Sequence, residues 1–219
     1  EPALLNFQLD VKPGQMIAIT GTNGSGKSTV LKVLAGMVVP QAGHVSVDGV
    51  DIRQIDVREL RTGIAYLPQT ATLFHGTVAQ NLRLAEPTAS DGALERAAED
   101  AGVLADIRSL PEGFDTHLTD QRLRTMPGGF QQRLALARAL VRDCEILLLD
   151  EPATGLDEAG DTALMRALAA MRGRRTVLIV THRPSHMKLC DRVVVLDAGR
   201  VTMDGPAPDV VRRLTEGNL

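Results

Sequence analysis

The sequence predicts an α/β fold built on a mixed, mainly parallel sheet. Two fully apolar strands are expected at 145–150 and 176–182, and a helical pattern at 161–172 lies between them. A strand, a helix and a second apolar strand in this order are typical of a parallel sheet that is buried on both faces. The block 77–141 is mainly helical in pattern, so we expect it to be an inserted helical subdomain.

The amino-terminal part predicts two strands and a helix. Apolar residues alternate from Leu5 to Val11, a turn follows at 12–15, and a second apolar stretch runs from Met16 to Thr20. Helical spacing begins after the glycine-rich segment that follows Thr20, and we expect this helix to be stopped by Pro40.

The remaining elements follow from turn and cap signals. Asp48-Gly49 lies between alternating residues and predicts a hairpin. Thr77 and Gln80 have the spacing of a capping box, which predicts a helix start. Other patterns predict a short helix and a strand at 57–67, an amphipathic helical stretch at 92–107, a hairpin at 192–205 and a short helix at 208–217.

Composition limits the classes of function. The chain has 219 residues, which suffices for one large domain or a core with a subdomain. The formal charge of -3 with one Tyr, four Phe and no Trp disfavours a nucleic-acid partner. Cys144 and Cys190 are isolated and predict reduced thiols in a cytosolic compartment. No apolar run has the length of a membrane span, so we expect any membrane segment to lie outside this chain.

The stretch GTNGSGKST matches the phosphate-binding loop pattern, directly after an apolar strand and before a helix. Its glycines let the backbone N–H groups face phosphates, and the helix N-terminus adds positive potential. Lys27 is predicted to reach the β- and γ-phosphates of a nucleotide, and Ser28 to coordinate Mg²⁺. The candidate nucleotide-binding residues of this loop are Gly21, Thr22, Asn23, Gly24, Ser25, Gly26, Lys27, Ser28 and Thr29.

The stretch ILLLDEP, residues 146–152, predicts a buried strand that delivers two carboxylates to its carboxyl end. Asp150 is predicted to hold the Mg²⁺ shell, and Glu151 to orient the attacking water. If this motif stood alone, a solvated acidic pair that caps a strand would be the favoured interpretation. The phosphate-binding loop in the same chain favours the catalytic interpretation.

Taken together, these motifs resemble the nucleotide-binding domain of an ABC transporter over nearly the whole chain. GTNGSGKST resembles Walker A, Gln69 in YLPQ the Q-loop, ILLLDE Walker B, Asp157 in ATGLD the D-loop, and His182 in VTHR the switch histidine. The resemblance implies a P-loop NTPase (RecA-like) core with an antiparallel β region and an inserted helical subdomain. It implies ATP and Mg²⁺ as ligands, with Gln69 sensing the metal and γ-phosphate and His182 contacting that phosphate.

The domain boundaries follow from the same resemblance. The ATP-binding core would comprise 1–69 and 142–219, with its amino-terminal strands incomplete, and the helical subdomain 70–141. The family stacks adenine on an aromatic residue upstream of where this chain begins, so we expect a fragment of a longer polypeptide. Phe7 and Tyr66 are not convincing substitutes, because one alternates with core positions and the other lies in a predicted strand.

MPGGFQQR lies where the family places its LSGGQ signature, with Met126, Pro127 and Phe130 as substitutions. In the family this loop contacts the γ-phosphate bound to a partner domain, so Gly128 and Gly129 are candidate nucleotide-binding residues. Pro127 supplies neither the hydroxyl nor an N–H. The contact should therefore be weaker by about one charge-assisted hydrogen bond, on the order of 1.5 to 3 kcal/mol.

Softer features resemble ABC exporters, and the carboxyl end, LCDRVVVLDAGRV, resembles the type I secretion branch, which exports polypeptides. LFHGTVAQNL resembles the segment that receives the membrane domains, so we expect these to contact Gln69 to Leu82. The expected partner is a second nucleotide-binding domain, in a homodimer or heterodimer, at the cytoplasmic face of the cell membrane. A non-transport ABC ATPase that acts as a mechanical clamp, and a regulatory ATP-binding subunit with little turnover, remain as alternatives.

Overall fold

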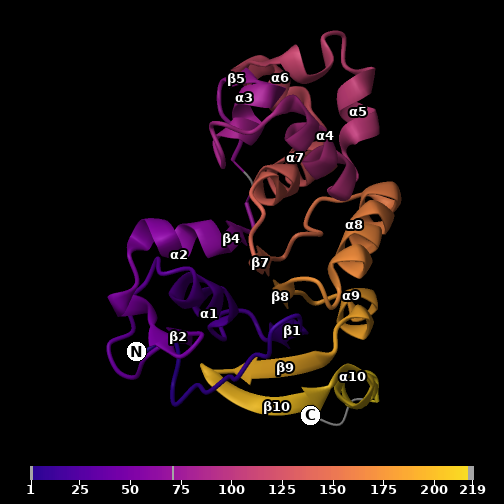
Figure 1. Cartoon of the computed structure of the whole chain (residues 1–219). Helices are drawn as coiled ribbons and strands as arrows, with labels where there is room; N and C mark the ends of the chain where they lie inside the picture. The colour runs from indigo at the N-terminus through magenta and orange to yellow at the C-terminus, as the bar shows by residue number, and fades with distance from the viewer. Residues whose placement is uncertain (1, 71, 217–219) are drawn as a thin grey trace. The chain divides into compact units, whose positions relative to one another are not determined.

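The computed structural model describes residues 2–70 and 72–216 (Figure 1). Contacts divide the chain into two compact units, which we describe separately. Unit 1 comprises Glu1–Tyr66, Cys144–Glu151 and Met171–Leu219, and unit 2 comprises Leu67–Asp143 and Pro152–Ala170. The limits of the predicted ATP-binding core and helical subdomain, given above, stay a prediction.

Unit 1 is built on a six-stranded sheet with the strand order β10-β9-β1-β8-β7-β4. Strands β7, β8, β1 and β9 pair in parallel, and β10 pairs antiparallel with β9. The strands are β1 (Met16–Gly21), β4 (Ile64–Leu67), β7 (Ile146–Asp150), β8 (Thr176–Val180), β9 (Arg192–Asp197) and β10 (Arg200–Pro206). The predicted mixed, mainly parallel α/β sheet is therefore confirmed.

The core of unit 1 lies between this sheet and helix α1 (Lys27–Leu34). Apolar side chains of β1 and β8, and those of Leu147, Leu148 and Leu149 in β7, are fully or almost fully buried, as expected for parallel strands. The other elements of unit 1 are β2 (Ser46–Val47), β3 (Val50–Asp51), a 3₁₀ turn (Ile52–Gln54), α2 (Val57–Gly63), α9 (Pro184–Leu189) and α10 (Ala207–Thr215).

The predictions made from turn and cap residues are confirmed for two elements. Asp48 and Gly49 have φ of 50° and 80°, as a two-residue hairpin turn requires, and they connect β2 to β3. The capping box at Thr77 is present, with Gln80 as its second member. Between β9 and β10, the turn residues Ala198 and Gly199 are also left-handed, with φ of 43° and 76°.

Two expectations for the amino-terminal part were wrong. No strand forms at 5–11, although Phe7, Leu9 and Val11 pack against the core as their alternation predicted. The left-handed φ of 49° at Asn6 interrupts extended backbone at the start of this segment. Helix α1 ends at Leu34, well before Pro40, because Gly36 adopts a φ of 67° and the Met37 N–H bonds back to Lys32 O.

Unit 2 is mainly helical, as its sequence predicted. Its contacts centre on helices α4 and α7, which pack against each other. Its elements are β5 (Gly76–Thr77), α3 (Val78–Arg83), α4 (Asp91–Asp100), α5 (Leu104–Ser109), a 3₁₀ turn (Gly113–Asp115), β6 (His117–Leu118), α6 (Asp120–Thr125), α7 (Gly128–Val141) and α8 (Glu158–Met171). Among the described residues of the whole chain, no helix is both long enough and apolar enough to span a membrane.

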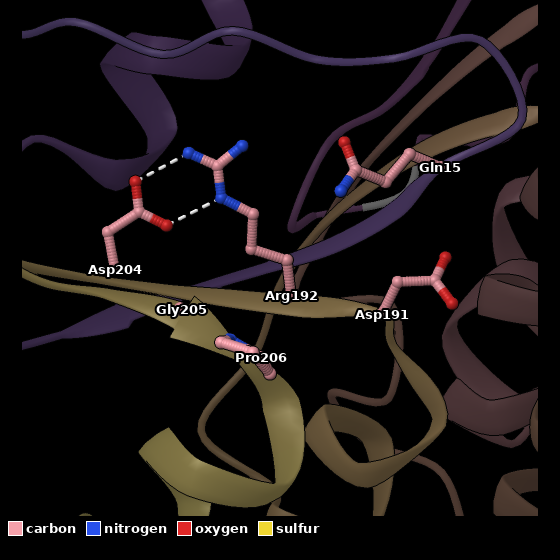
Figure 2. Close-up of a pocket in the computed structure, with 6 residues that line it drawn as sticks. All are labelled: Gln15, Asp191, Arg192, Asp204, Gly205 and Pro206. Carbon is pink, nitrogen blue, oxygen red and sulfur yellow. Dashed lines mark hydrogen bonds and ion pairs between the residues drawn. The ribbon is translucent and has the colours of Figure 1, made fainter.

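Figure 2 shows a shallow hollow beside β9 and β10 in unit 1. Its polar side chains are occupied with one another and with the backbone. Arg192 donates to both carboxylate oxygens of Asp204 and to Asp10 O, while Asp191 accepts from Met16 N and from Arg172. These bonds hold the β9–β10 hairpin together and to the rest of the sheet. We therefore interpret the hollow as structural and not as a binding site.

Candidate functional site: a phosphate-binding loop and the ends of three strands

The loop after β1 curls because its glycines take backbone conformations that other residues avoid. Gly21, Gly24 and Gly26 have φ of 139°, 77° and 99°. A Cβ on Gly21 would lie 1.9 Å from the carbonyl oxygen of Leu196, so β9 passes directly against this glycine. Helix α1 then begins at Lys27, and the first N–H groups of this helix adjoin the loop.

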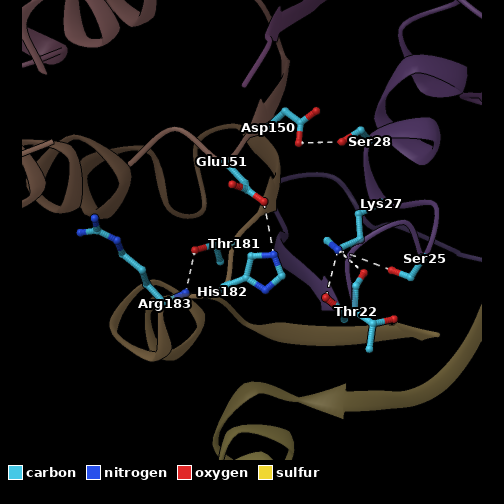
Figure 3. A network of polar contacts seen from close by, with 10 residues as sticks. Thr22, Ser25, Lys27, Ser28, Asp150, Glu151, Thr181, His182 and Arg183 are labelled. Atoms are coloured by element: carbon cyan, nitrogen blue, oxygen red, sulfur yellow. Dashed lines mark hydrogen bonds and ion pairs between the residues drawn. The ribbon is translucent and has the colours of Figure 1, made fainter. Parts of the chain in front are cut away.

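Lys27 lies inside this loop with only 7% of its surface exposed. Its Nζ donates to Gly21 O at 3.0 Å, to Thr22 O at 2.7 Å and to Ser25 Oγ at 3.5 Å (Figure 3). Burial lowers the pKa of Lys27, and the carboxylates of Glu151 and Asp150 oppose that shift. The loop therefore holds a cation that is bonded mainly to backbone carbonyls.

Asp150 ends β7 opposite the start of α1. Its Oδ1 accepts a hydrogen bond from Ser28 Oγ at 3.1 Å (Figure 3), and its Oδ2 lies 3.4 Å from the hydroxyl of Tyr66. Burial raises the pKa of Asp150, while the hydrogen bonds from Ser28 and Tyr66 act in the opposite direction. Burial also raises the pKa of Tyr66 to about 12, so its phenol stays protonated at neutral pH.

Ser28 and Asp150 fit a magnesium site of the kind that nucleotides complete. They offer two adjacent oxygen ligands, and Mg²⁺ in such sites is held by one or two protein oxygens plus phosphates and water. Among the described residues, no group of three or more His, Cys, Asp or Glu side chains could hold a metal by itself. The donor set therefore suits a metal bound together with a phosphate ligand.

Glu151 and His182 meet beyond the ends of β7 and β8. The Nε2 of His182 lies 3.3 Å from Glu151 Oε1 (Figure 3), a contact that becomes an ion pair when the imidazole is protonated. Glu151 has a left-handed φ of 47°, and its N–H donates to Val180 O. A left-handed backbone conformation at a residue other than glycine is strained, and strained residues of this kind often occur in active sites.

The β9–β10 hairpin also supports the loop, through contacts that no sequence pattern indicated. Thr22 Oγ1 donates to Asp197 Oδ1 at 2.8 Å, and Gly199 N donates to Ser25 O at 3.1 Å. Asp197 is the last residue of β9, 175 residues beyond Thr22, and Gly199 lies in the turn between β9 and β10. No local pattern indicates a pair so far apart.

Four of the predicted site residues lie in unit 2. Gln69 follows β4, Gly128 and Gly129 are the first residues of α7, and Asp157 lies just before α8. Within unit 2, a Cβ on Gly129 would lie 3.5 Å from Gly155 O, so the predicted signature and D-loop segments are neighbours. Asp157 Oδ1 accepts a hydrogen bond from Gly160 N at 2.8 Å.

The predicted signature loop receives hydrogen bonds from the side chain of Gln131. Pro127 is the N-cap of α7, with φ of -54° and ψ of 135°, and it makes no side-chain cap. Gln131 Nε2 donates to Leu123 O at 2.7 Å and to Met126 O at 3.2 Å. Phe130 is 7% exposed, so it belongs to the core of unit 2.

The fold and the site of unit 1 define a nucleotide-binding α/β domain of the P-loop class. The profile of the ABC transporter family matches residues 4–154. The chain belongs to the ABC transporter family.

Two curated relatives and one solved structure are similar to this chain, and two of these three are named as a flippase or an exporter. The mitochondrial potassium channel ATP-binding subunit of Xenopus tropicalis is 40% identical over 96% of this chain, which spans 30% of that protein. The ATP-dependent lipid A-core flippase of Thiobacillus denitrificans is 35% identical over 97% of the chain and 37% of its own length. The solved structure of a bacterial Atm1-family ABC exporter with ATP bound superposes with a TM-score of 0.89, at 33% identity, covering 96% of this chain and 37% of that one.

Proposed function

We propose that this chain binds Mg-ATP and hydrolyses it as the ATPase domain of an ABC exporter. The observation that carries the proposal is the meeting of Lys27, Ser28, Asp150, Glu151 and His182 at the ends of three neighbouring strands. The carboxyl ends of parallel strands are where open α/β sheets bind ligands. The chain spans 30% and 37% of two of its curated relatives, so export and its substrate are part of the proposal.

Each residue has a role that its surroundings support. The loop N–H groups and Lys27 would bind the β- and γ-phosphates, and the ammonium would exchange its carbonyl partners for phosphate oxygens. Ser28 and Asp150 would hold Mg²⁺, which neutralises phosphate charge when bound. Glu151 would orient and polarise the attacking water, and His182 would hold that carboxylate and contact the γ-phosphate.

The residues of unit 2 would act with partner proteins. Gln69 would bind the metal and report its presence to the membrane domains, which would contact the segment from Gln69 to Leu82. Ala71 within that segment lies outside the described residues. Gly128, Gly129 and Asp157 would complete the ATP site of a second nucleotide-binding domain, and the assembly would lie on the cytoplasmic face of the membrane. A polypeptide cargo stays a prediction.

Glu151→Gln tests the proposal. Removing the carboxylate that orients water should lower kcat about 10²- to 10⁴-fold, because general-base catalysis contributes that much. Mg-ATP binding, measured by calorimetry, should change little, and gel filtration with ATP should show an accumulated dimer. Lys27→Ala is the control, because it should abolish nucleotide binding itself. Unchanged turnover in Glu151→Gln would remove Glu151 from the reaction.

A further inference from the structure

Tyr66 is placed to act on the carboxylate of Asp150. The residue lies in β4, and its ring packs against the buried cluster that includes Leu31 and Leu148, so the core fixes the direction of the side chain. Only the phenol hydroxyl reaches out of this packing toward a polar group, and that group is Asp150 Oδ2 at 3.4 Å.

The two oxygens of Asp150 have different partners. Oδ1 faces Ser28 Oγ at 3.1 Å, whereas Oδ2 faces the phenol of Tyr66. Asp150 is 3% exposed, so water cannot orient this carboxylate as it would on a surface. The hydrogen-bond donors around a buried carboxylate determine its orientation, and that orientation is less well fixed when one donor is removed.

We propose that Tyr66 is a positioning residue that orients Asp150 for Mg²⁺ by holding Oδ2, which leaves Oδ1 beside Ser28. The inference rests on the proposed function, since it concerns the metal that accompanies ATP. Groups that hydrogen-bond to a metal-binding carboxylate fix its direction, and their loss commonly reduces metal affinity about 10- to 100-fold. At 3.4 Å the bond is long, so we expect the lower end of this range.

The sequence offers a direct readout of this contact. Tyr66 is the only tyrosine, and the chain has no tryptophan. The intrinsic tyrosine fluorescence of the protein therefore comes from the side chain beside Asp150. A change in the hydrogen bonding of the phenol when Mg²⁺ binds should alter that emission.

The experiment uses the whole chain and a non-hydrolysable ATP analogue. In the parent, Mg²⁺ is titrated at saturating analogue while tyrosine emission is followed, with a Mg²⁺-free nucleotide titration as correction for adenine absorbance. The same titration in Asp150→Asn should give no emission change. Calorimetry then measures Mg²⁺ affinity in the parent and in Tyr66→Phe, which keeps the ring and removes only the hydroxyl. We expect about tenfold weaker Mg²⁺ binding in Tyr66→Phe.

Nucleotide affinity in EDTA is the matched control, because a general disruption of the site would lower it as well. Unchanged affinity in EDTA with weakened Mg²⁺ binding supports the positioning role. If the parent and Tyr66→Phe both bind the analogue with equal Mg²⁺ affinity, the role of Tyr66 is overturned and the proposed function is not. Tyrosine emission that does not change when Mg²⁺ binds to the parent would overturn that role in the same way. Failure of the parent to bind the Mg²⁺ complex at all would overturn the proposed function, and the role of Tyr66 with it.

Discussion

Pro127→Ser is the substitution that most sharply tests how the signature loop works. Pro127 caps α7 with φ of -54° and ψ of 135°, and neither its ring nor its nitrogen can donate to a phosphate. Pro206 occupies the N-cap position of α10 with φ of -53° and ψ of 137°, and its side chain also makes no capping hydrogen bond. Pro206→Ser therefore makes the same backbone change at a helix that has no predicted part in catalysis.

The expected effect on stability is small and equal for the two variants. A serine N-cap stabilises a helix by about 0.5 to 2 kcal/mol. Loss of the proline releases conformational freedom in the unfolded chain, which costs about 0.4 to 1 kcal/mol. The two contributions nearly cancel, and about 1 kcal/mol moves Tm by roughly 2 to 4 °C in a chain of this size. Both variants should therefore melt within about 4 °C of the parent.

The expected effect on turnover differs between them. The hydroxyl of Pro127→Ser adds a hydrogen bond to the γ-phosphate of a partner domain, worth on the order of 1.5 to 3 kcal/mol. That gain corresponds to a factor of about 10 to 150 for each ATP site, and a dimer of two variant chains has two such sites. Phe130 is left unchanged, because it is 7% exposed and a glutamine there would bury an amide.

The assay is ATPase rate as a function of protein concentration. If this chain works in a heterodimer and relies on a partner's intact signature, the parent should dimerise poorly and Pro127→Ser should reach half-maximal specific activity at a much lower concentration. Pro206→Ser should follow the parent curve. A parent that already shows cooperative activity equal to that of Pro127→Ser would refute this reasoning, and it would indicate a homodimer that works through Gly128, Gly129 and the helix dipole.

Two further predictions concern the phosphate-binding loop. Gly21→Ala should lower the free energy of unfolding by roughly 2 to 6 kcal/mol, because the new Cβ would strain the backbone and lie 1.9 Å from an atom of β9. Gly24→Ala should lower it by only about 1 to 2 kcal/mol, because nothing lies within 4 Å of its Cβ. Equal urea midpoints for the two variants would contradict this prediction. Asp197→Ala and Thr22→Val should each raise the KM for ATP about fivefold, because each removes the same hydrogen bond of about 1 kcal/mol. The double variant should therefore raise the KM no further. Additive effects would show that the bond between Thr22 and Asp197 does not position the loop.

The sequence predicted the parts of the fold that local pattern determines. The apolar runs that became β7 and β8 predict parallel strands because both of their faces are buried. The turn at Asp48-Gly49 and the cap at Thr77 depend on residues within a few positions of each other. The glycine-rich loop was recognisable for the same reason, since its pattern lies within nine consecutive residues.

Other features depend on partners that no local pattern reveals. Alternation correctly indicated that Phe7, Leu9 and Val11 face the core, whereas Leu4 packs there in place of Leu5. Burial does not require backbone pairing, and no strand formed. The end of α1 was decided by Gly36 and not by Pro40, because a left-handed glycine satisfied the last carbonyls first. The sequence pattern places Tyr66 in a strand but does not indicate its contact with Asp150, which lies 84 positions further along the chain.

The division of site residues between the two units bears on which steps each can control. Lys27, Ser28, Asp150, Glu151 and His182 all follow strands of one hydrogen-bonded sheet or begin the helix packed on it. A sheet of this kind deforms little, so their mutual distances depend on unit 1 alone. Binding of the phosphates, and of the metal by Ser28 and Asp150, should therefore be properties of unit 1. The family roles proposed for Gln69 and the signature glycines concern a partner domain and the membrane, so unit 2 would govern when bound ATP is used.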